Sequence, residues 1–449
     1  MGAHAPQRAV GCPLPANAQE HPISTTAPEP SEVVPPRIYA HVVVVAMFGG
    51  FFVMGWLWLY TWFMNHVWYS DYVTSHHWMF PVICIPFSFL VGVIVKYLKA
   101  PTNLDGSFLE SLTGDASDIK WRLFPATVAE SLASLWSGAA LGPEGGIGAL
   151  SSQIAGFYNE KMKIPEQHRS RLVFGSVSSA YNGLLENPVF TGVLGYEVQQ
   201  QAKGRATLAA NLLGGAIGYV IFGLLGGKGL AGFLDLPAVT SFKFLDVVYV
   251  IVLAMVGVVL AVILALLLRV ATQVFARLND RIIIRALAAG VVFSVVGYFA
   301  PIVMFSGEDQ IHTVISDPAH YGLALLLVMA LGKFALLAIG FRSGFLGGPT
   351  FPSIFSVVCV AEAIHIAIPG LSLTILIAGL LPGLLMMLFK TPFMVILLTA
   401  FMLSASENLV ALIVFAVAAV LFVQPYLERF MAARQAATPA PAAPPSPAS

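Results

Sequence analysis

Apolar stretches long enough to cross a lipid bilayer recur along almost the whole sequence. They lie at residues 38–64, 79–98, 123–141, 207–226, 246–270, 282–304, 319–341, 370–389 and 407–427. Several of them reach the ~20 residues that a spanning helix needs. Hydrophobic residues make up 57% of the chain and charged residues only 10%, which excludes a soluble globular protein. We therefore expect an all-α polytopic membrane protein.

Polar segments flank the apolar region at both ends. Residues 1–37 are rich in Pro, Ala and Glu, and residues 435–449 form an Ala/Pro/Ser tail, so two disordered tails are expected. Arg37 precedes the first apolar stretch and Lys96 ends the second, whereas the loop 65–78 between them has no Lys or Arg. Basic residues also precede the C-terminal tail. Because cytoplasmic loops carry the excess of Lys and Arg, both tails are predicted to be cytoplasmic, in a multi-pass protein of the cell (inner) membrane.

Several other function classes find little support in the side chains. The formal net charge is zero, so nothing indicates nucleic-acid binding. The histidines of loop 65–78 lie among Trp and Tyr, as interfacial residues do, and the three cysteines lack metal or redox spacing. No metal and no cofactor are therefore expected. Ser343 and Ser353 have no neighbouring His that could serve as a base, so an enzyme is not expected either.

One Gly-rich turn carries a single carboxylate inside the apolar sequence. It is Gly142-Pro143-Glu144-Gly145-Gly146, and the apolar residues 147–154 follow it. Glycine and proline end one helix and allow another to begin. A helix that begins within a bilayer points unpaired N–H groups and a partial positive charge at whatever lies before it. A carboxylate is costly at such depth, so we expect Glu144 to be functional rather than a simple helix cap.

A second turn of the same kind, Gly347-Gly348-Pro349-Thr350-Phe351-Pro352, lies about half a chain later. Each turn is followed by another apolar segment that begins around a proline. The distance from Glu144 to Pro188 is 44 residues, and so is the distance from Gly348 to Pro392. Two matched pairs with equal spacing are hard to produce by chance.

The equal spacing predicts an inverted internal duplication, with residues 38–226 as the first membrane repeat and 227–434 as the second. The shorter apolar segments lie at 146–158, 171–184, 187–198, 350–364 and 391–403. Broken helices are tolerated at membrane depth only where they are buried in protein or line a polar cavity. We therefore expect these segments to meet at a shared site near the middle of the membrane.

Helix N-termini that converge with few charged side chains nearby describe a site for an anion. Backbone N–H groups bind an anion weakly enough for it to leave, whereas Lys or Arg would hold it. Glu144 can then act as a gate, because its ionised carboxylate takes the place of the anion and its protonated form vacates that place. Two readings stay open here: an anion channel or anion/proton antiporter, or another inverted-repeat secondary transporter for fluoride, another anion or a small carboxylate.

The motifs resemble those of the CLC family of chloride channels and chloride/proton antiporters. Residues 142–146 resemble its Gly-Lys/Arg-Glu-Gly-Pro motif, and residues 347–353 its Gly-Gly-x-Phe-x-Pro-Ser motif. Residues 187–197 are similar to a Pro-Leu-Ala-Gly stretch that ends in glutamate, and residues 305–311 to a loop before the second-half pore helices. The resemblance runs over residues 37–430 in the family's order, and is to members without a soluble nucleotide-binding domain pair. It implies a homodimer in membrane lipid, with one chloride pathway per subunit and protons as a second cargo in antiporters.

The resemblance also implies which groups face the anion. Glu144 corresponds to the gating glutamate. The backbone of the two turns is expected to bind the anion, at Gly142, Gly145, Gly146, Thr350 and Phe351. The chain departs from the family at Pro143, which replaces a basic residue, and at Pro349, which has no N–H to offer.

Two side-chain ligands of the family have less clear counterparts. The segment that supplies the central serine is not recognisable, and Thr102 or Asn103 is expected to substitute for it, with Ser107 as an alternative. Tyr426 corresponds to the pore tyrosine, one residue out of register, or is an interfacial Tyr at a helix end.

Proton coupling has the weakest support in the sequence. Glu197 matches the first of two glutamates at the end of its segment, but the second, which is the internal proton acceptor of the antiporters, falls on Val198. Glu186 is a further carboxylate that could relay protons or only cap a helix. The sequence therefore indicates anion permeation more firmly than antiport.

Overall fold

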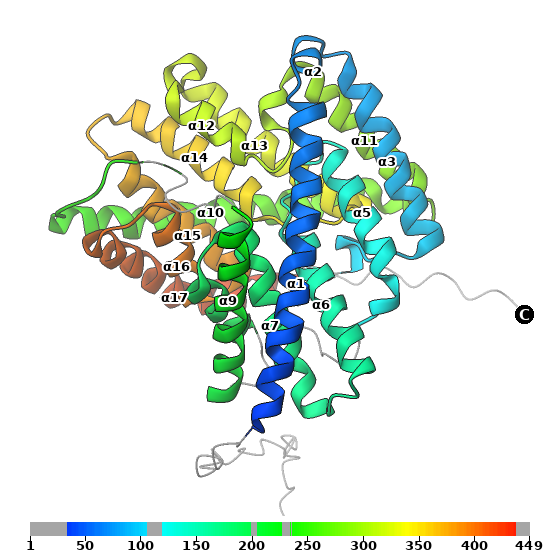
Figure 1. Ribbon diagram of the computed structural model, residues 1–449. Coiled ribbons are helices and arrows are strands. Elements are labelled where there is room, and N and C mark those ends of the chain that lie inside the picture. The colour runs from blue at the N-terminus through cyan, green and yellow to red at the C-terminus, as the bar shows by residue number, and fades with distance from the viewer. Residues whose placement is uncertain (1–33, 106–118, 199–203, 227–233, 235, 437–449) are drawn as a thin grey trace, which may run out of the picture. The chain divides into compact units, whose positions relative to one another are not determined.

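The chain folds into closely packed helices, as its apolar stretches predict (Figure 1). The computed structural model describes residues 34–105, 119–198, 204–226, 234 and 236–436. Its α-helices are α1 (Pro36–Phe63), α2 (Asp71–Ser75), α3 (Met79–Val93), α5 (Phe124–Trp136), α6 (Glu144–Lys161), α7 (Glu166–Leu185), α8 (Pro188–Val198), α9 (Arg205–Leu224), α10 (Phe244–Phe275), α11 (Ile282–Phe299), α12 (Glu308–Ser316), α13 (Pro318–Ser343), α14 (Thr350–Ala367), α15 (Leu373–Phe389), α16 (Pro392–Met402) and α17 (Glu407–Ala436). Within the described ranges there is no β-strand.

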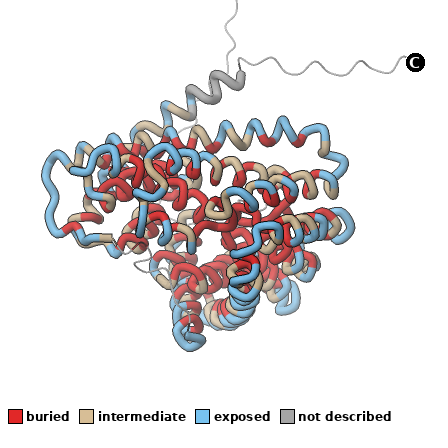
Figure 2. The backbone as a smooth tube through the Cα atoms, turned by 90° about the horizontal axis from the view of Figure 1, so that it is seen from above, coloured by how far each residue is buried: buried red, intermediate tan, exposed pale blue. Residues whose placement is uncertain are grey.

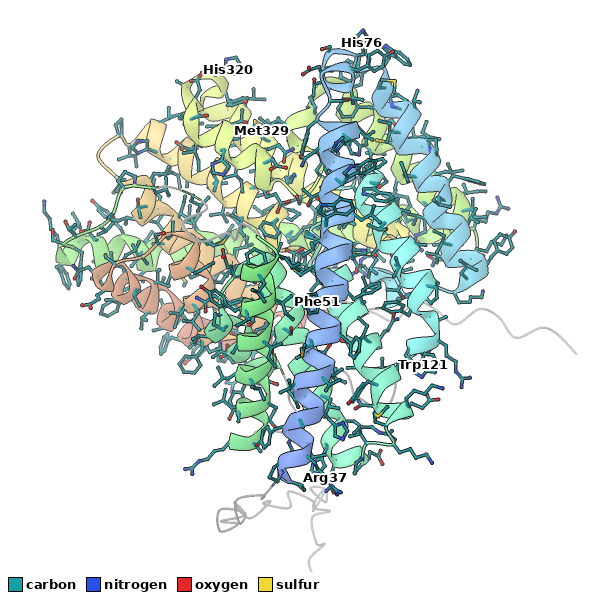
Figure 3. All side chains as sticks on the ribbon, viewed as in Figure 1. Arg37, Phe51, His76, Trp121, His320 and Met329 are labelled. Carbon is teal, nitrogen blue, oxygen red and sulfur yellow. The ribbon has the colours of Figure 1, made fainter. Side chains whose placement is uncertain are left out.

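Eight of the described helices are long and apolar enough to cross a bilayer, which confirms a polytopic all-α membrane protein. Arg37 at the start of α1 and His76 beyond its other end lie at opposite ends of the helix assembly (Figure 3). Buried residues concentrate in the interior of this assembly, and exposed ones lie on its outer helices and loops (Figure 2). Large apolar side chains such as Phe48 and Phe299 are exposed on its surface. Extensive apolar surface of this kind is what lipid contact requires.

Three apolar stretches differ in length from the prediction. Residues 123–141 contain only the 13-residue helix α5, because Gly138 adopts φ +83°, a left-handed conformation that ends the helical region. Conversely, the short segments 146–158 and 350–364 belong to α6 and α14, which have 18 residues each. Buried Ser, Gln and Asn side chains lower the hydropathy of α6 and hide its full length in the sequence.

The duplication predicted from spacing is visible in the helices. α6 and α14 begin at the two Gly-rich turns, and α8 and α16, with 11 residues each, begin at Pro188 and Pro392. α8 contacts α16 directly. The N-terminus of α8 is capped by its own chain, since Asn187 Oδ1 accepts from the N–H groups of Val189 (3.0 Å) and Phe190 (2.9 Å).

Glycine allows two pairs of helices to approach closely. A Cβ at Gly214 or Gly218 of α9 would collide with the backbone of α7. A Cβ at Gly257 of α10 or Gly383 of α15 would likewise collide with the backbone of the other helix of that pair. Small residues at such contacts are typical of membrane helices, where burial of apolar surface does not drive association. α7 also contacts α6 and α8, and α15 contacts α14 and α16, so each pair supports two of the helices around the site.

Candidate functional site

The two Gly-rich turns meet in the interior of the protein. The Gly142 N–H donates to the Gly348 carbonyl at 2.9 Å, and the Gly348 N–H donates to the Gly142 carbonyl at 2.7 Å. This isolated antiparallel bridge brings the first residues of α6 and α14 together. A Cβ at either bridging glycine would collide with the Glu144 side chain. The absence of side chains at these two positions is therefore what makes room for the Glu144 carboxylate.

Glu144 extends its carboxylate across to the start of α14. The side chain is 3% exposed, and its Oε1 accepts a hydrogen bond from the Phe351 N–H at 3.3 Å. Its Oε2 has no hydrogen-bond partner among the described residues. The first N–H groups of a helix and its dipole favour negative charge. The carboxylate thus occupies a place where a small anion would also be stabilised.

A cavity of about 30 Å³ adjoins Glu144. Its polar wall comes from Glu144, Tyr181 and Thr350, and the rest is apolar. The apolar residues are Leu184, Leu185, Phe190, Leu194, Phe351, Phe389, Met394 and Leu398. A volume of this size holds about one water-sized particle. The wall comes from α6, α7, α8, α14, α15 and α16, so all four helices of the duplicated pairs contribute.

Tyr181 fixes the backbone of the first turn. Its hydroxyl donates to the Glu144 carbonyl at 2.9 Å, and the side chain is buried. This hydrogen bond joins α7 to the first residue of α6. Tyr181 was not identified from the sequence, because only the packing of α7 against α6 brings the two residues together.

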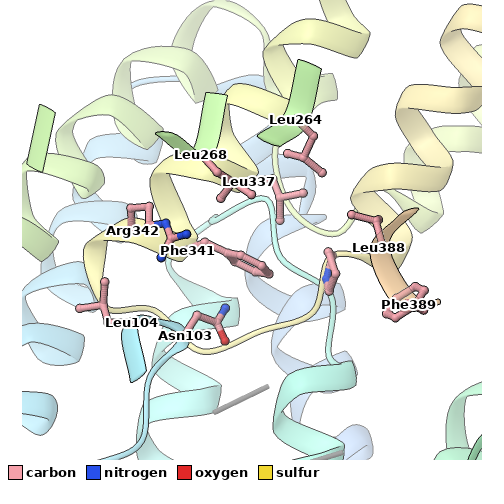
Figure 4. A pocket seen from close by; sticks show the side chains of 10 residues that line it. Asn103, Leu104, Leu264, Leu268, Leu337, Phe341, Arg342, Leu388 and Phe389 are labelled. Carbon is pink, nitrogen blue, oxygen red and sulfur yellow. The ribbon is translucent and has the colours of Figure 1, made fainter. Parts of the chain in front are cut away.

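A second and larger cavity, of about 280 Å³, lies beside the second turn (Figure 4). Pro349 and Phe389 line it together with Asn103 and Arg342; its other lining residues are Leu104, Leu264, Leu268, Leu337, Phe341 and Leu388. Phe389 lines both cavities and so stands between them. The Asn103 Nδ2 donates to the Gly347 carbonyl at 2.9 Å. This bond anchors the segment that follows α3 to the second turn.

Arg342 supplies a positive charge to the larger cavity. It forms no ion pair with any described residue, since the one pair found in those ranges joins Arg122 and Glu160. Its Nε also lacks a hydrogen-bond partner there. In the sequence, Arg342 is a lone arginine between an apolar stretch and the second turn, and this signal was not recognised as part of a site.

The structure brings some of the predicted ligands together and leaves others elsewhere. Thr350 and Phe351 line the small cavity, and Asn103 lines the large one. Thr102 is buried but lines neither cavity, and its Oγ1 accepts from the Leu104 N–H at 3.2 Å. Ser107 lies outside the described residues. The Asn103 alternative therefore fits the site better than Thr102 does.

The glycines of the first turn make close contacts within the protein and do not line the cavity beside Glu144. The N–H of Gly142 is used in the bridge to Gly348, so it cannot also bind an anion while that bridge is intact. Gly145 lies against the backbone of Gly347, and Gly146 lies against the ring of Trp56. Neither glycine lines the cavity beside Glu144.

Tyr426 does not reach the site. It is 62% exposed on α17, where its ring lies beside Phe422, and it lines neither cavity. The alternative prediction, an interfacial tyrosine at a helix end, agrees with the exposed position but not with the helix end, because α17 continues to Ala436. The tyrosine that the structure places next to Glu144 is Tyr181.

The two carboxylates considered for proton transfer lie at helix ends. Glu197, near the end of α8, accepts from the N–H groups of Phe393 (3.0 Å) and Met394 (2.6 Å) and so caps α16. Glu186 follows α7 with a left-handed φ of +43° and is half-buried. Neither carboxylate lines the cavity beside Glu144. No group of three or more metal-ligating side chains occurs in the described ranges.

Comparison with known proteins identifies a family and solved structures of similar fold. The sequence signature of the family described as Voltage gated chloride channel matches residues 87–424. The fold is similar to that of a slow cyanobacterial Cl−/H+ antiporter, with a TM-score of 0.70 and 18% identity over 90% of this chain and 100% of that one. It is also similar to a CLC-type fluoride/proton antiporter, with a TM-score of 0.64 and 20% identity over 87% of this chain and 96% of that one. No curated protein matches the chain in sequence at a significant level.

Proposed function

The chain belongs to the voltage-gated chloride channel family, and from that premise we propose that it moves small inorganic anions across a membrane through a pathway gated by Glu144. Chloride is the first anion to consider, carried by a channel or by an anion/proton antiporter. One observation carries the proposal: the Glu144 carboxylate lies at the N-terminus of α14, on the Phe351 N–H. Chloride at this position would receive the same stabilisation as the carboxylate.

Glu144 gates by competing with the anion for this position. When ionised, its carboxylate fills the place before α14 and closes the pathway. When protonated, the side chain loses its charge-assisted attraction to the N–H groups and swings away, so that an anion takes its place. Flux is therefore expected to rise as pH falls. The largely apolar wall of the cavity supplies no cation that would hold the anion there.

The larger cavity is the entrance from the Arg342 side. The Arg342 guanidinium attracts anions, and Asn103, which lines the same cavity, is hydrogen-bonded to Gly347 of the second turn. Phe389, which lines both cavities, is where an anion must pass from the entrance to the gate.

The family and the distribution of charge support a membrane location, an oligomeric state and an orientation for the protein. We place the protein in the cell (inner) membrane as a homodimer with one pathway per subunit. Both tails are cytoplasmic, because Arg37 and Lys96 flank the first two spans on one side. Residues 38–226 and 227–434 are the two membrane repeats. The protein acts as a transporter or channel and not as an enzyme.

Fluoride is the second candidate. The cavity of about 30 Å³ beside Glu144 has room for one small anion of either kind, and Pro349 removes one N–H donor at the start of α14 that the anion would otherwise use. The likeness in fold to a fluoride/proton antiporter is compatible with this alternative.

Flux from proteoliposomes tests the proposal. Efflux of chloride, fluoride and nitrate is measured over a range of pH, with proton movement recorded at the same time, for the wild type and for Glu144→Ala. We expect the wild type to pass at least one of these anions faster at low pH, and Glu144→Ala to lose most of this dependence. Unchanged anion flux and unchanged pH dependence in Glu144→Ala would refute the gate. Stoichiometric proton movement in the wild type would identify an antiporter.

A further inference from the structure

Glu130 on α5 carries a buried carboxyl group that the gating step described above does not use. The side chain is fully buried. It forms no ion pair in the described ranges, and its Oε2 has no hydrogen-bond partner there. A carboxyl group buried without a cation is costly, and in a membrane protein such groups are usually functional. The contacts of its other oxygen indicate what that function is.

The Oε1 atom of Glu130 orients the hydroxyl group of Ser134. This hydroxyl group lies one helical turn further along α5 and donates to the Glu130 Oε1 at 2.7 Å. A serine inside a helix can instead donate to the backbone carbonyl one turn before it. Ser151 on α6 and Ser294 on α11 do so, at 2.6 and 2.7 Å. Ser134 differs because the Glu130 side chain offers an acceptor at the same spacing.

The Ser134 oxygen also accepts a hydrogen bond from the segment that leads into the second Gly-rich turn. The Leu346 N–H donates to the Ser134 Oγ at 3.0 Å, and both residues are buried. A Ser134 hydroxyl group that donated to the α5 backbone would have to turn towards that backbone and away from Leu346. The Leu346 N–H would then lose this partner in a buried place. Glu130 therefore keeps Ser134 in the orientation that Leu346 needs.

Leu346 belongs to the segment that positions the start of α14. Asn103 donates to the carbonyls on either side of Leu346, from its N–H to Phe345 at 3.3 Å and from its Nδ2 to Gly347 at 2.9 Å. Two residues after Leu346, Gly348 forms the backbone bridge to the first turn. The hydrogen bond from Leu346 to α5 thus helps to fix the place of the first N–H groups of α14, on which the proposed anion site depends.

Resting on the proposed function, we propose that Glu130 is a positioning residue of the anion pathway. Through Ser134 it fixes Leu346 and so holds the start of α14, where N–H groups stabilise the anion or the Glu144 carboxylate. Glu130 itself lines neither cavity. Binding groups must be held within about 0.5 Å of the productive geometry by the residues behind them. Loss of Glu130 or Ser134 therefore weakens anion binding.

The half-saturating anion concentration for flux tests this role in proteoliposomes that contain the full chain. The anion is whichever of chloride, fluoride and nitrate the wild type passes fastest. All variants are made in the Glu144→Ala background, where no carboxylate competes with the anion for the start of α14. Ser134→Ala and Glu130→Leu are each expected to raise the half-saturating concentration about fivefold or more, because each leaves a buried donor without its acceptor.

Two further variants serve as the rescue and the matched control. Glu130→Gln keeps an amide oxygen that accepts from Ser134, so it is expected to recover most of the affinity that Glu130→Leu loses. Ser131→Ala removes a neighbouring hydroxyl group on the same helix, which donates to the Val128 carbonyl at 3.1 Å. It is expected to leave the half-saturating concentration unchanged.

The double variant shows whether Glu130 acts through Ser134. If it does, adding Glu130→Leu to Ser134→Ala changes the half-saturating concentration by less than about twofold, because the group on which Glu130 acts is already gone. An equal fold-change with and without the Ser134 hydroxyl group would refute the inference. So would unchanged half-saturating concentrations in both single variants, even with a lower thermal midpoint. Should Glu130→Leu fail to fold, Glu130→Ala takes its place, because a smaller side chain needs no additional space.

The outcomes separate this inference from the proposed gate, which is tested by the pH dependence of flux in the wild type and in Glu144→Ala. If Glu144→Ala keeps the pH dependence while Ser134→Ala and Glu130→Leu raise the half-saturating concentration, the gate is refuted and the positioning role stands. If the pH dependence is lost and neither variant changes the half-saturating concentration, the gate stands and the positioning role is refuted. A wild type that passes none of the three anions overturns the proposed function and this inference with it.

Discussion

Gly142 and Gly348 exchange both backbone hydrogen bonds, at 2.9 and 2.7 Å, although about half the chain separates them. Each glycine lies in one of the two turns that the sequence repeats. The Glu144 carboxylate fills the space that a side chain at either position would need. The position of the gate therefore depends on two side chains that are absent, and substitutions there can move the gate without touching Glu144.

Gly142→Ala is expected to force the gate open. A Cβ at this position would collide with the Oε2, Cδ and Oε1 atoms of Glu144, which are the far end of a flexible side chain. Gly142 is not among the described glycines with positive φ, so alanine fits its backbone conformation. A penalty of about 1.4 kcal/mol on the closed position of Glu144 raises the open fraction about tenfold. The prediction is tested by measuring anion flux at alkaline pH in Gly142→Ala and in the wild type, together with the thermal midpoint of both proteins.

Gly145→Ala provides the contrast to this variant. Its Cβ would collide with the backbone of Gly347, which cannot move aside. We expect a loss of about 1–3 kcal/mol in the free energy of unfolding instead of a selective gain in flux. Equal flux and equal stability in the two variants would show that the Glu144 side chain does not occupy the space beside Gly142.

Glu197→Gln is expected to weaken the contact between the two repeats. Glu197 on α8 accepts from two N–H groups at the start of α16, and an amide offers one acceptor where the carboxylate offers two. Loss of this charge-assisted cap should cost about 1–2 kcal/mol of unfolding free energy, seen as a lower thermal midpoint. Proton movement per anion should stay at the wild-type value. Loss of proton movement at an unchanged midpoint would instead restore Glu197 as a proton carrier.

The main elements of the fold could be predicted because they depend on local sequence. Stretches of apolar residues are long helices wherever a bilayer is the solvent. The equal spacing of Glu144 to Pro188 and Gly348 to Pro392 located the starts of α6, α8, α14 and α16 to within two residues. It also indicated that these helices meet, because broken helices need a shared polar interior.

The side chains around Glu144 could not be predicted in the same way. Tyr181 approaches Glu144 only because α7 packs against α6, and Glu197 meets α16 only because α8 lies beside it. Helix crossings of this kind depend on glycines such as Gly214 and Gly257, whose partners the linear sequence does not show. Tyr426 was selected by its position along the chain, yet α17 turns that side chain towards the surface.

Tyr181→Phe is expected to loosen the gate without removing it. The substitution deletes the hydroxyl that donates to the Glu144 carbonyl at 2.9 Å and leaves that carbonyl without this partner in a buried place. A buried acceptor left unsatisfied costs about 1–3 kcal/mol. We expect a lower thermal midpoint and a broader dependence of anion flux on pH. Tyr158→Phe is a control at the other end of α6, where the hydroxyl meets His41 at 2.8 Å, and it should leave the pH dependence of flux unchanged.

Arg342→Gln is expected to weaken anion entry at low anion concentration. The guanidinium lines the larger cavity and has no ion-pair partner among the described residues, so its charge is available to an entering anion. In water a unit charge a few ångströms away contributes about 1 kcal/mol to anion binding. Loss of this contribution corresponds to about a fivefold rise in the half-saturating anion concentration.

Arg342→Lys keeps the charge and should stay close to the wild type. Arg122→Gln removes an exposed arginine that pairs with Glu160 at 3.9 Å and should leave anion flux unchanged. Equal half-saturating concentrations in Arg342→Gln and the wild type would place the anion entrance elsewhere. A loss of maximal flux alone would mean that Arg342 supports the second turn and does not attract the anion.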